Sequence, residues 1–152
     1  MGLRERILAD TKEAMKAKET ARLSTLRLIS AAIKDREIAA RTEGGDKDGL
    51  SEADLTAILS KMVKQRQESA KAYEEGGRLE LAERELDEIA LIQSYLPRQL
   101  GEDETRAAID KAIADLGAAS IRDMGRVMAE LRANYAGQMD FGAVGPAIKE
   151  RL

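Results

Sequence analysis

The sequence predicts an all-α protein, and three observations lead to that class. Hydrophobic residues make up 43% of the 152 residues and charged residues 35%, whereas aromatic residues make up only 3%. Apolar positions recur three and four residues apart through most of the chain, which is the period of an amphipathic helix. Glycine and proline interrupt this pattern at few places. We expect an elongated N-terminal four-helix domain over residues 1–96, followed by a C-terminal three-helix module over residues 97–152.

The first two predicted helices run over residues 3–16 and from Thr20 to a polar, glycine-rich loop at residues 42–49. Thr20 is placed to cap the second helix, because its hydroxyl can accept a free amide hydrogen of the first turn. The core-facing positions are expected to be Leu3, Ile7, Leu8, Thr11, Ala14 and Met15 in the first helix, and Leu23, Leu26, Ile29 and Ile33 in the second.

The third and fourth helices are predicted between Ser51 and Pro97. Ser51 with Asp54 resembles a capping box, which marks a helix start. The glycine pair at 76–77 ends the third helix, and the fourth covers residues 78–95. Pro97 ends the fourth helix, since proline lacks an amide hydrogen and disfavours helical backbone at the residue before it. The inner faces are predicted to be Leu55, Ile58, Leu59, Met62, Val63, Arg66, Ala70 and Tyr73, then Ala82, Leu86, Ile89, Ile92 and Leu96.

The fifth and sixth helices follow the proline. Acidic residues 102–104 suit the first turn of the fifth helix, where the backbone dipole is positive, and Gly117 is suited to end it. Ser120 and Asp123 offer a second capping box, which predicts the start of the sixth helix.

The last segment begins at Asp140 and carries a proline at position 146. Because proline is tolerated at the first position of a helix, we expect a turn first and regular helix only from Pro146.

The charge of the chain is −3, but its distribution is uneven: +4 over residues 1–42, −6 over residues 43–96 and −1 over residues 97–152. Two interpretations remain open, namely steering of a polyanion to the basic end, or attraction between the two helix sets. We expect a cytoplasmic protein, because cysteine and any long apolar run are absent.

Catalytic chemistry has little support in the sequence. Histidine and cysteine are absent, so the chain has no thiolate, no common general base and no preferred transition-metal ligands. Residues 46–49 match part of a calcium loop, but Gly44 and Leu55 stand where carboxylate ligands belong. We predict no catalytic residue, no cofactor and no metal.

The stretch Asp123 to Met128, followed by Gly137 and Asp140, resembles the GatB/YqeY family. Further matching segments are 25–29, 64–69, 78–88 and 95–97. The resemblance implies an all-helical fold and a role in translation. In that family the C-terminal module forms the tail of the B subunit of the tRNA-dependent amidotransferase, a carbon–nitrogen ligase with glutamine as amido-N-donor. That tail is associated with holding the tRNA body, so the resemblance implies a free-standing, non-catalytic tRNA-binding module.

Candidate nucleic-acid contacts lie in two regions: Arg122, Gly125, Arg126 and Arg132 on the sixth helix, and Lys12, Lys16, Lys18, Arg22 and Arg27 in the basic first third. A glycine inside a helix is unfavourable, so Gly125 indicates close approach of either a neighbouring helix or a ligand. The alternative function is a protein adaptor with no nucleic-acid role, which would receive a partner helix on Met124, Met128 and Phe141. An amide-transfer enzyme is a third alternative.

Overall fold

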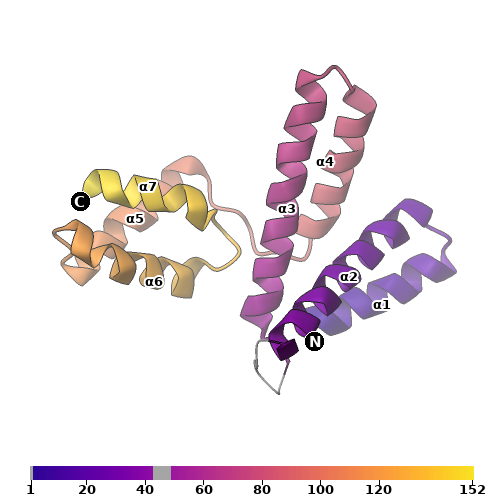
Figure 1. The fold of residues 1–152 in the computed structure, drawn as a ribbon, viewed down its shortest axis with the longest axis horizontal. Helices are drawn as coiled ribbons and strands as arrows, with labels where there is room; N and C mark the ends of the chain where they lie inside the picture. Colours follow the sequence, from indigo (N-terminus) through magenta and orange to yellow (C-terminus); the bar gives the residue numbers. More distant parts are fainter. Residues whose placement is uncertain (1, 43–48) are drawn as a thin grey trace. The chain divides into compact units, whose positions relative to one another are not determined.

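A computed structural model describes residues 2–42 and 49–152, and Figure 1 shows their path. The prediction of an all-α fold is confirmed, since these residues form helices and connecting turns without a strand. The elements are α1 (Leu3–Lys16), α2 (Thr20–Thr42), α3 (Glu52–Glu75), α4 (Leu79–Gln93), α5 (Glu102–Leu116), the short 3-10 helix η1 (Ile121–Asp123), α6 (Met124–Tyr135) and α7 (Phe141–Arg151). The chain divides into two compact units, Met1–Leu96 and Pro97–Leu152.

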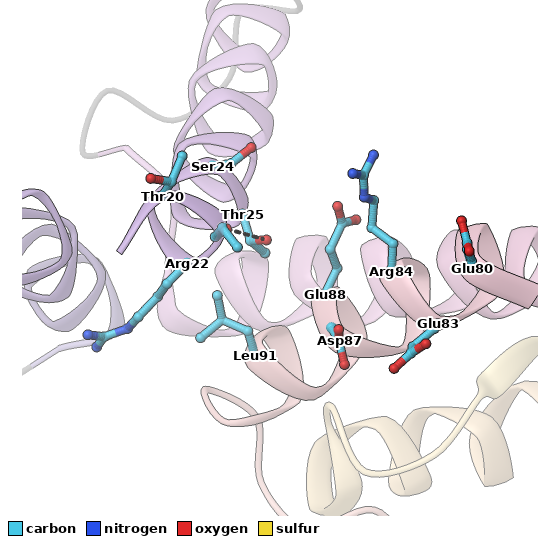
Figure 2. A pocket seen from close by; sticks show the side chains of 11 residues that line it. Thr20, Arg22, Ser24, Thr25, Glu80, Glu83, Arg84, Asp87, Glu88 and Leu91 are labelled. Atoms are coloured by element: carbon cyan, nitrogen blue, oxygen red, sulfur yellow. Dashed lines mark hydrogen bonds between the residues drawn. The ribbon is translucent and has the colours of Figure 1, made fainter. Parts of the chain in front are cut away.

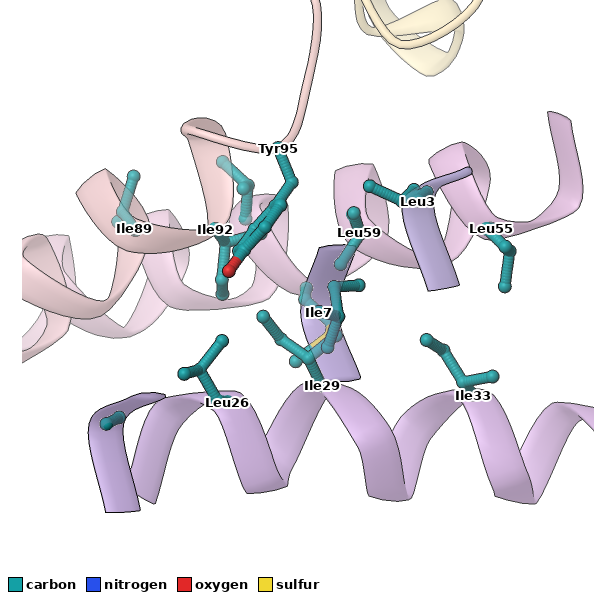
Figure 3. Close-up of a cluster of buried hydrophobic side chains, with 13 residues drawn as sticks. Leu3, Ile7, Leu26, Ile29, Ile33, Leu55, Leu59, Ile89, Ile92 and Tyr95 are labelled. Carbon is teal, nitrogen blue, oxygen red and sulfur yellow. The ribbon is translucent and has the colours of Figure 1, made fainter. Parts of the chain in front are cut away.

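The first unit is built from two antiparallel helix pairs, α1 with α2 and α3 with α4 (Figure 1). Figure 3 shows Leu26, Ile29 and Ile33 of α2 facing Leu59 of α3 and Ile92 of α4. All five side chains are buried, as the helical period predicts. The remaining buried members of this core are Leu3, Ile7, Ala14, Leu55, Met62, Val63, Ile89 and Tyr95.

Polar contacts tie α1 to the other helix pair. Tyr95, just after α4, is 7% exposed, and its hydroxyl donates a hydrogen bond to the carboxylate of Asp10 on α1. The guanidinium of Arg6 lies 5.3 Å from the centre of the Tyr95 ring. At the start of α1, the backbone N–H of Leu3 donates to the Glu52 carboxylate, 3.2 Å from Oε2. These contacts fix the start and the middle of α1 to the second helix pair.

Three residues assigned to inner faces are instead exposed. Leu8 is 56% exposed, Met15 52% and Leu86 48%, so their predicted burial was wrong. Leu8 and Met15 directly follow the buried Ile7 and Ala14, and one residue turns a helix by about 100°. The buried stripe of α1 is therefore narrower than a three-and-four pattern suggests, and Leu86 lies beyond the edge of the buried stripe of α4.

Helix starts follow the predicted capping only in part. Ser51 and Asp54 form the predicted capping box: the Ser51 hydroxyl accepts from the Asp54 amide at 3.1 Å, and the Asp54 carboxylate accepts from the Ser51 amide at 3.0 Å. Thr20, predicted as a cap, is already helical. The Glu19 carbonyl accepts the Leu23 amide hydrogen at 2.9 Å, so Glu19 precedes the first turn.

Two predicted helix ends are confirmed by left-handed glycines. Gly77 follows α3 with φ +72° and Gly117 follows α5 with φ +62°, a backbone region that glycine enters without steric cost. The predicted polar loop at 42–49 lies largely outside the described residues, which exclude 43–48, and so does the rejected calcium loop at 46–49.

The second unit encloses its own apolar core between α5, α6 and α7. The backbone N–H of Leu100 donates to the carbonyl of Gln138 at 2.9 Å, which joins the segment before α5 to the segment before α7. The buried side chains are Ala108, Ile109, Ala112, Val127, Leu131, Met139, Val144 and Ile148.

Helix α7 corrects the prediction for the last segment, because regular helix begins at Phe141 and Pro146 lies inside it. The Asp140 carboxylate accepts from the Gly142 amide at 3.0 Å and so caps the start of the helix well before Pro146. Proline disfavours helical backbone before it partly through the Cβ of the preceding residue. Gly145 has no Cβ, so this restriction is relaxed and the helix continues through the proline.

Candidate nucleic-acid interface

The arginines predicted on the sixth helix do not form one cluster. Only half of the predicted capping box is present: the Asp123 carboxylate accepts the Ser120 amide hydrogen at 3.4 Å, whereas the Ser120 hydroxyl makes no cap bond. The residues after Ser120 form η1, so Arg122 lies in that short turn and outside α6. Arg126 and Arg132 are six residues apart on α6, which places their side chains about 120° apart around the axis. The placement of Arg122 on the sixth helix is therefore wrong, and Arg126 and Arg132 lie on different sides of α6.

The side chain of Arg126 makes an ion pair and a hydrogen bond within the second unit. Its Nη1 lies 3.2 Å from the Asp123 carboxylate, and its Nη2 donates to the carbonyl of Leu116 at 3.1 Å. Asp123 also accepts the Ala119 and Ser120 amide hydrogens, and these bonds hold the pKa of its carboxyl below the usual range. Arg126 thus joins the start of α6 to the end of α5.

Arg132 has a different environment, because its guanidinium lies 5.7 Å from the centre of the Phe141 ring. Phe141, Met124 and Met128 are half-buried and pack against the second core. The methyl carbons of the two methionines lie 3.5 and 3.6 Å from the position of a Cβ added to Gly145. The three predicted partner-binding side chains therefore serve the packing of their own unit.

Gly125 lies on an exposed part of α6. A Cβ added there would have no heavy atom of another element within 4 Å. Close approach of a neighbouring helix therefore does not explain this glycine.

Arg22 is enclosed by carboxylates. It lies 3.0 Å from Glu19, 3.8 Å from Glu13 and 3.9 Å from Asp10. The hydrogen bond to Glu19 raises the pKa of this guanidinium above its usual value. A phosphate would have to displace three acidic neighbours, so Arg22, in the first turn of α2, is a poor phosphate contact.

The other basic candidates of residues 1–42 are exposed and free of carboxylate partners among the described residues. Lys12, Lys16, Lys18 and Arg27 are exposed and make no ion pair among the described residues. Lys12 and Lys16 share one face of α1 at a spacing of four, and Lys18 occupies the turn before α2 with φ +59°. We call Lys12, Lys16 and Lys18 the lysine group.

Two exposed cations of α2, Lys34 and Arg41, were missed by the sequence reasoning. They follow Arg27 at steps of seven residues, a spacing that places side chains on one side of a helix. This seven-residue spacing is the feature of the sequence from which the two cations could have been predicted.

A polar cleft of about 780 Å³ lies between α2 and α4 (Figure 2). Its α2 side carries the hydroxyls of Thr20, Ser24 and Thr25. Its α4 side carries the carboxylates Glu80, Glu83, Asp87 and Glu88 with Arg84. Negative charge repels phosphate, so this cleft is a poor nucleic-acid site.

Across 2–42 and 49–152, acidic side chains nowhere gather in a group of three able to hold a metal ion. Within those ranges, every helix is too short or too polar to cross a bilayer.

Comparison with known proteins identifies the family. Residues 4–152 match the family described as Yqey-like protein. The chain belongs to the YqeY-like family. This membership confirms the GatB/YqeY resemblance that the α6 sequence indicates.

Named relatives of this YqeY-like chain come from yeasts. It is 38% identical over 87 residues to "Altered inheritance of mitochondria protein 41, mitochondrial" of Eremothecium gossypii, covering 57% of this chain and 45% of the relative. The protein of the same name from Clavispora lusitaniae is 39% identical over 87 residues, covering 57% and 47%. The chain thus spans less than half the length of these relatives.

These names contradict the predicted cytoplasmic location, because each relative is called mitochondrial. The prediction rested on the absence of cysteine and of a membrane span. Both features suit any reducing aqueous compartment, so they did not single out the cytoplasm.

Proposed function

We propose that this YqeY-like protein is an auxiliary, non-catalytic tRNA-binding protein, related to the tail of the glutamine-dependent tRNA amidotransferase. The observation that carries the proposal is the set of exposed cations Lys12, Lys16, Lys18 and Arg27, which make no ion pair among the described residues.

The positive charge of residues 1–42 supports this function, although the net charge of the whole chain is negative. The protein carries −3, so attraction to RNA must come from a basic region. Residues 1–42 carry +4 and supply that region. Proteins hold folded RNA largely through phosphate and 2′-hydroxyl contacts that depend on its shape, and lysine and arginine are suited to the phosphates.

The adaptor alternative has less support at its predicted surface. Met124, Met128 and Phe141 are half-buried against their own core, so little of them is left for a partner helix. Docking there would first require the second unit to repack.

A titration of tRNA tests the proposal. An in vitro transcribed tRNA is titrated with the protein at about 50 and about 200 mM salt by fluorescence anisotropy, and we expect affinity to fall steeply with salt. Replacing the lysine group (Lys12→Gln, Lys16→Gln, Lys18→Gln) should reduce the salt slope by about 0.9 for each phosphate that these lysines bind.

A matched control removes three charges elsewhere, with Lys71→Gln, Lys111→Gln and Lys149→Gln on α3, α5 and α7. All three lysines are exposed and make no ion pair among residues 2–42 and 49–152. This control should keep the slope of the unmodified protein. Absence of tRNA binding at the lower salt concentration would overturn the proposed function.

A further inference from the structure

We infer that α2 binds the phosphate backbone of a double-helical RNA segment through a row formed by Arg27, Lys34 and Arg41. This inference rests on the proposed function, and it adds the surface that makes contact and the form of RNA recognised. The three residues are called the α2 row below.

The α2 row is straight and long. Its members are separated by seven residues, or nearly two helical turns, so they lie about 10.5 Å apart along one side of the helix. The row therefore spans about 21 Å. A single phosphate or a mononucleotide would contact only one member, whereas a backbone strand would pass all three.

The α2 row faces away from the buried core that α2 forms with α3 and α4. Ile29 belongs to the core with these helices, and Arg36 acts electrostatically on Asp54 of α3. Arg27 and Lys34 are each two residues from one of these positions, and two residues turn a helix by about 200°. Their side chains thus point to the opposite side, where all three members of the row are exposed.

The positive charges of the α2 row are not neutralised by carboxylates of the described residues. Of the two acidic residues of α2, Glu37 is bound by Arg4 of α1, and Asp35 makes no ion pair with the row. The members of the row have no ion pair in the described part of the chain. They differ in this from Arg22, whose three carboxylate neighbours occupy its guanidinium.

The lysine group adds exposed cations on and after α1. Lys12 lies two residues from Asp10, whose carboxylate accepts from Tyr95 beside α4. Lys12 therefore points to the outer side of α1, as does Lys16 one turn later. Cations of both helices thus lie on sides that face away from the buried core.

The residue types favour a duplex over a single strand. Proteins hold single strands by stacking bases on aromatic side chains as well as by charge. The four aromatic residues of the chain are Tyr73, Tyr95, Tyr135 and Phe141, so α1 and α2 carry none. Recognition of double-helical RNA relies on phosphates and shape, which a row of cations can provide.

An anionic membrane is less suitable than RNA for this surface. Interfacial helices bury a broad apolar face in the lipid. The apolar face of α2 is already buried in the core, and of its large apolar side chains only Leu28 (43% exposed) and Ile38 (51% exposed) lie largely outside it.

The test replaces the α2 row by Arg27→Gln, Lys34→Gln and Arg41→Gln in the full chain. The control is the triple variant Lys71→Gln, Lys111→Gln and Lys149→Gln, which changes net charge equally. The probes are a tRNA transcript, an RNA duplex of about 20 base pairs and one strand of that duplex, each titrated over a range of salt. Circular dichroism verifies that each variant keeps its helix content.

We expect the unmodified protein to bind the duplex more tightly than the single strand. The row variant should lose about 2.7 from the salt slope, since three phosphate contacts contribute about 0.9 each, and the control should keep it. The variant Arg27→Lys, Arg41→Lys retains charge and should retain the slope.

The outcomes separate this inference from the proposed function. If tRNA binds and the row variant keeps the full slope, the inference is overturned while the proposed function stands. Tighter binding of the single strand overturns the duplex assignment. If no RNA binds the unmodified protein, both fail. Phosphatidylserine vesicles are tested in parallel, and binding to them without RNA binding would assign the row to a membrane.

Discussion

At the residue scale, single side chains show which sequence signals had a structural cause. Gly125 was singled out because a glycine is unfavourable in a helix, and the structure leaves open space where its side chain would be. Glu104 was grouped with two other acidic residues at a helix start. It is distinguished from them by two bonds from Arg98, at 2.7 and 2.9 Å.

Gly125→Ala should increase the free energy of unfolding by up to about 1 kcal/mol, because alanine favours helix and no atom obstructs its methyl group. Urea denaturation measures this change. A loss of stability would restore the packing explanation. If Gly125 contacts RNA closely, the same variant should bind tRNA more weakly although it is more stable.

Glu104 should make stability depend on pH in the acid range. The Arg98 hydrogen bonds, with one from the Gly101 amide, lower the pKa of Glu104 to about 2 from its ordinary 4.5. A carboxyl with a lowered pKa in the folded state stabilises the fold above pH 4.5, and this contribution is lost as pH falls from 4.5 towards 2.

Urea midpoints measured from about pH 2 to pH 6 check this dependence. Glu104→Gln should reduce the dependence in that window, whereas Glu150→Gln, an exposed position without an ion pair in the described residues, should not. An unchanged pH profile for Glu104→Gln would contradict the assigned role of Arg98.

At the element scale, helix positions were predictable where the signal is local. The capping box at Ser51 and the glycine end at Gly117 depend on a few neighbouring residues, and both are confirmed. The exposure of Leu8 and the helical Pro146 were not predictable in this way. The first depends on where α2 and α3 leave room, and the second on a glycine that relaxes a steric restriction.

Tyr95→Phe should destabilise the first unit by about 1–2 kcal/mol, since the phenol donates a hydrogen bond to the Asp10 side chain. The residue links the end of α4 to α1, and burial raises the pKa of its hydroxyl. Chemical denaturation gives the change, and Tyr73→Phe is the matched control because its hydroxyl makes no hydrogen bond in the described residues.

A double-mutant cycle with Asp10→Asn separates this bond from other effects of the phenylalanine. If the two single changes are additive, the hydroxyl and the carboxylate do not stabilise the fold together, and the expected loss of stability has another source.

At the scale of the whole molecule, composition and period predicted the fold class, whereas charge did not predict which cations form ion pairs. Arg22 and Arg126 were equal candidates with Arg27 in the sequence. Their carboxylate and carbonyl partners, such as Asp10 and Leu116, come from other turns or helices, so only tertiary structure shows which cations are occupied. The α2 row was readable as a seven-residue step, but its lack of partners was not.

The backbone at Lys18 has one more consequence. A lysine in the left-handed conformation is less favourable than a glycine by about 1–2 kcal/mol. Lys18 therefore lowers the free energy of unfolding of the protein at the turn before α2. Selection for thermal stability alone would favour Lys18→Gly, which removes a positive charge. At position 18 the demands of stability and of positive charge are therefore opposed, so variants selected for stability should also be assayed for RNA binding.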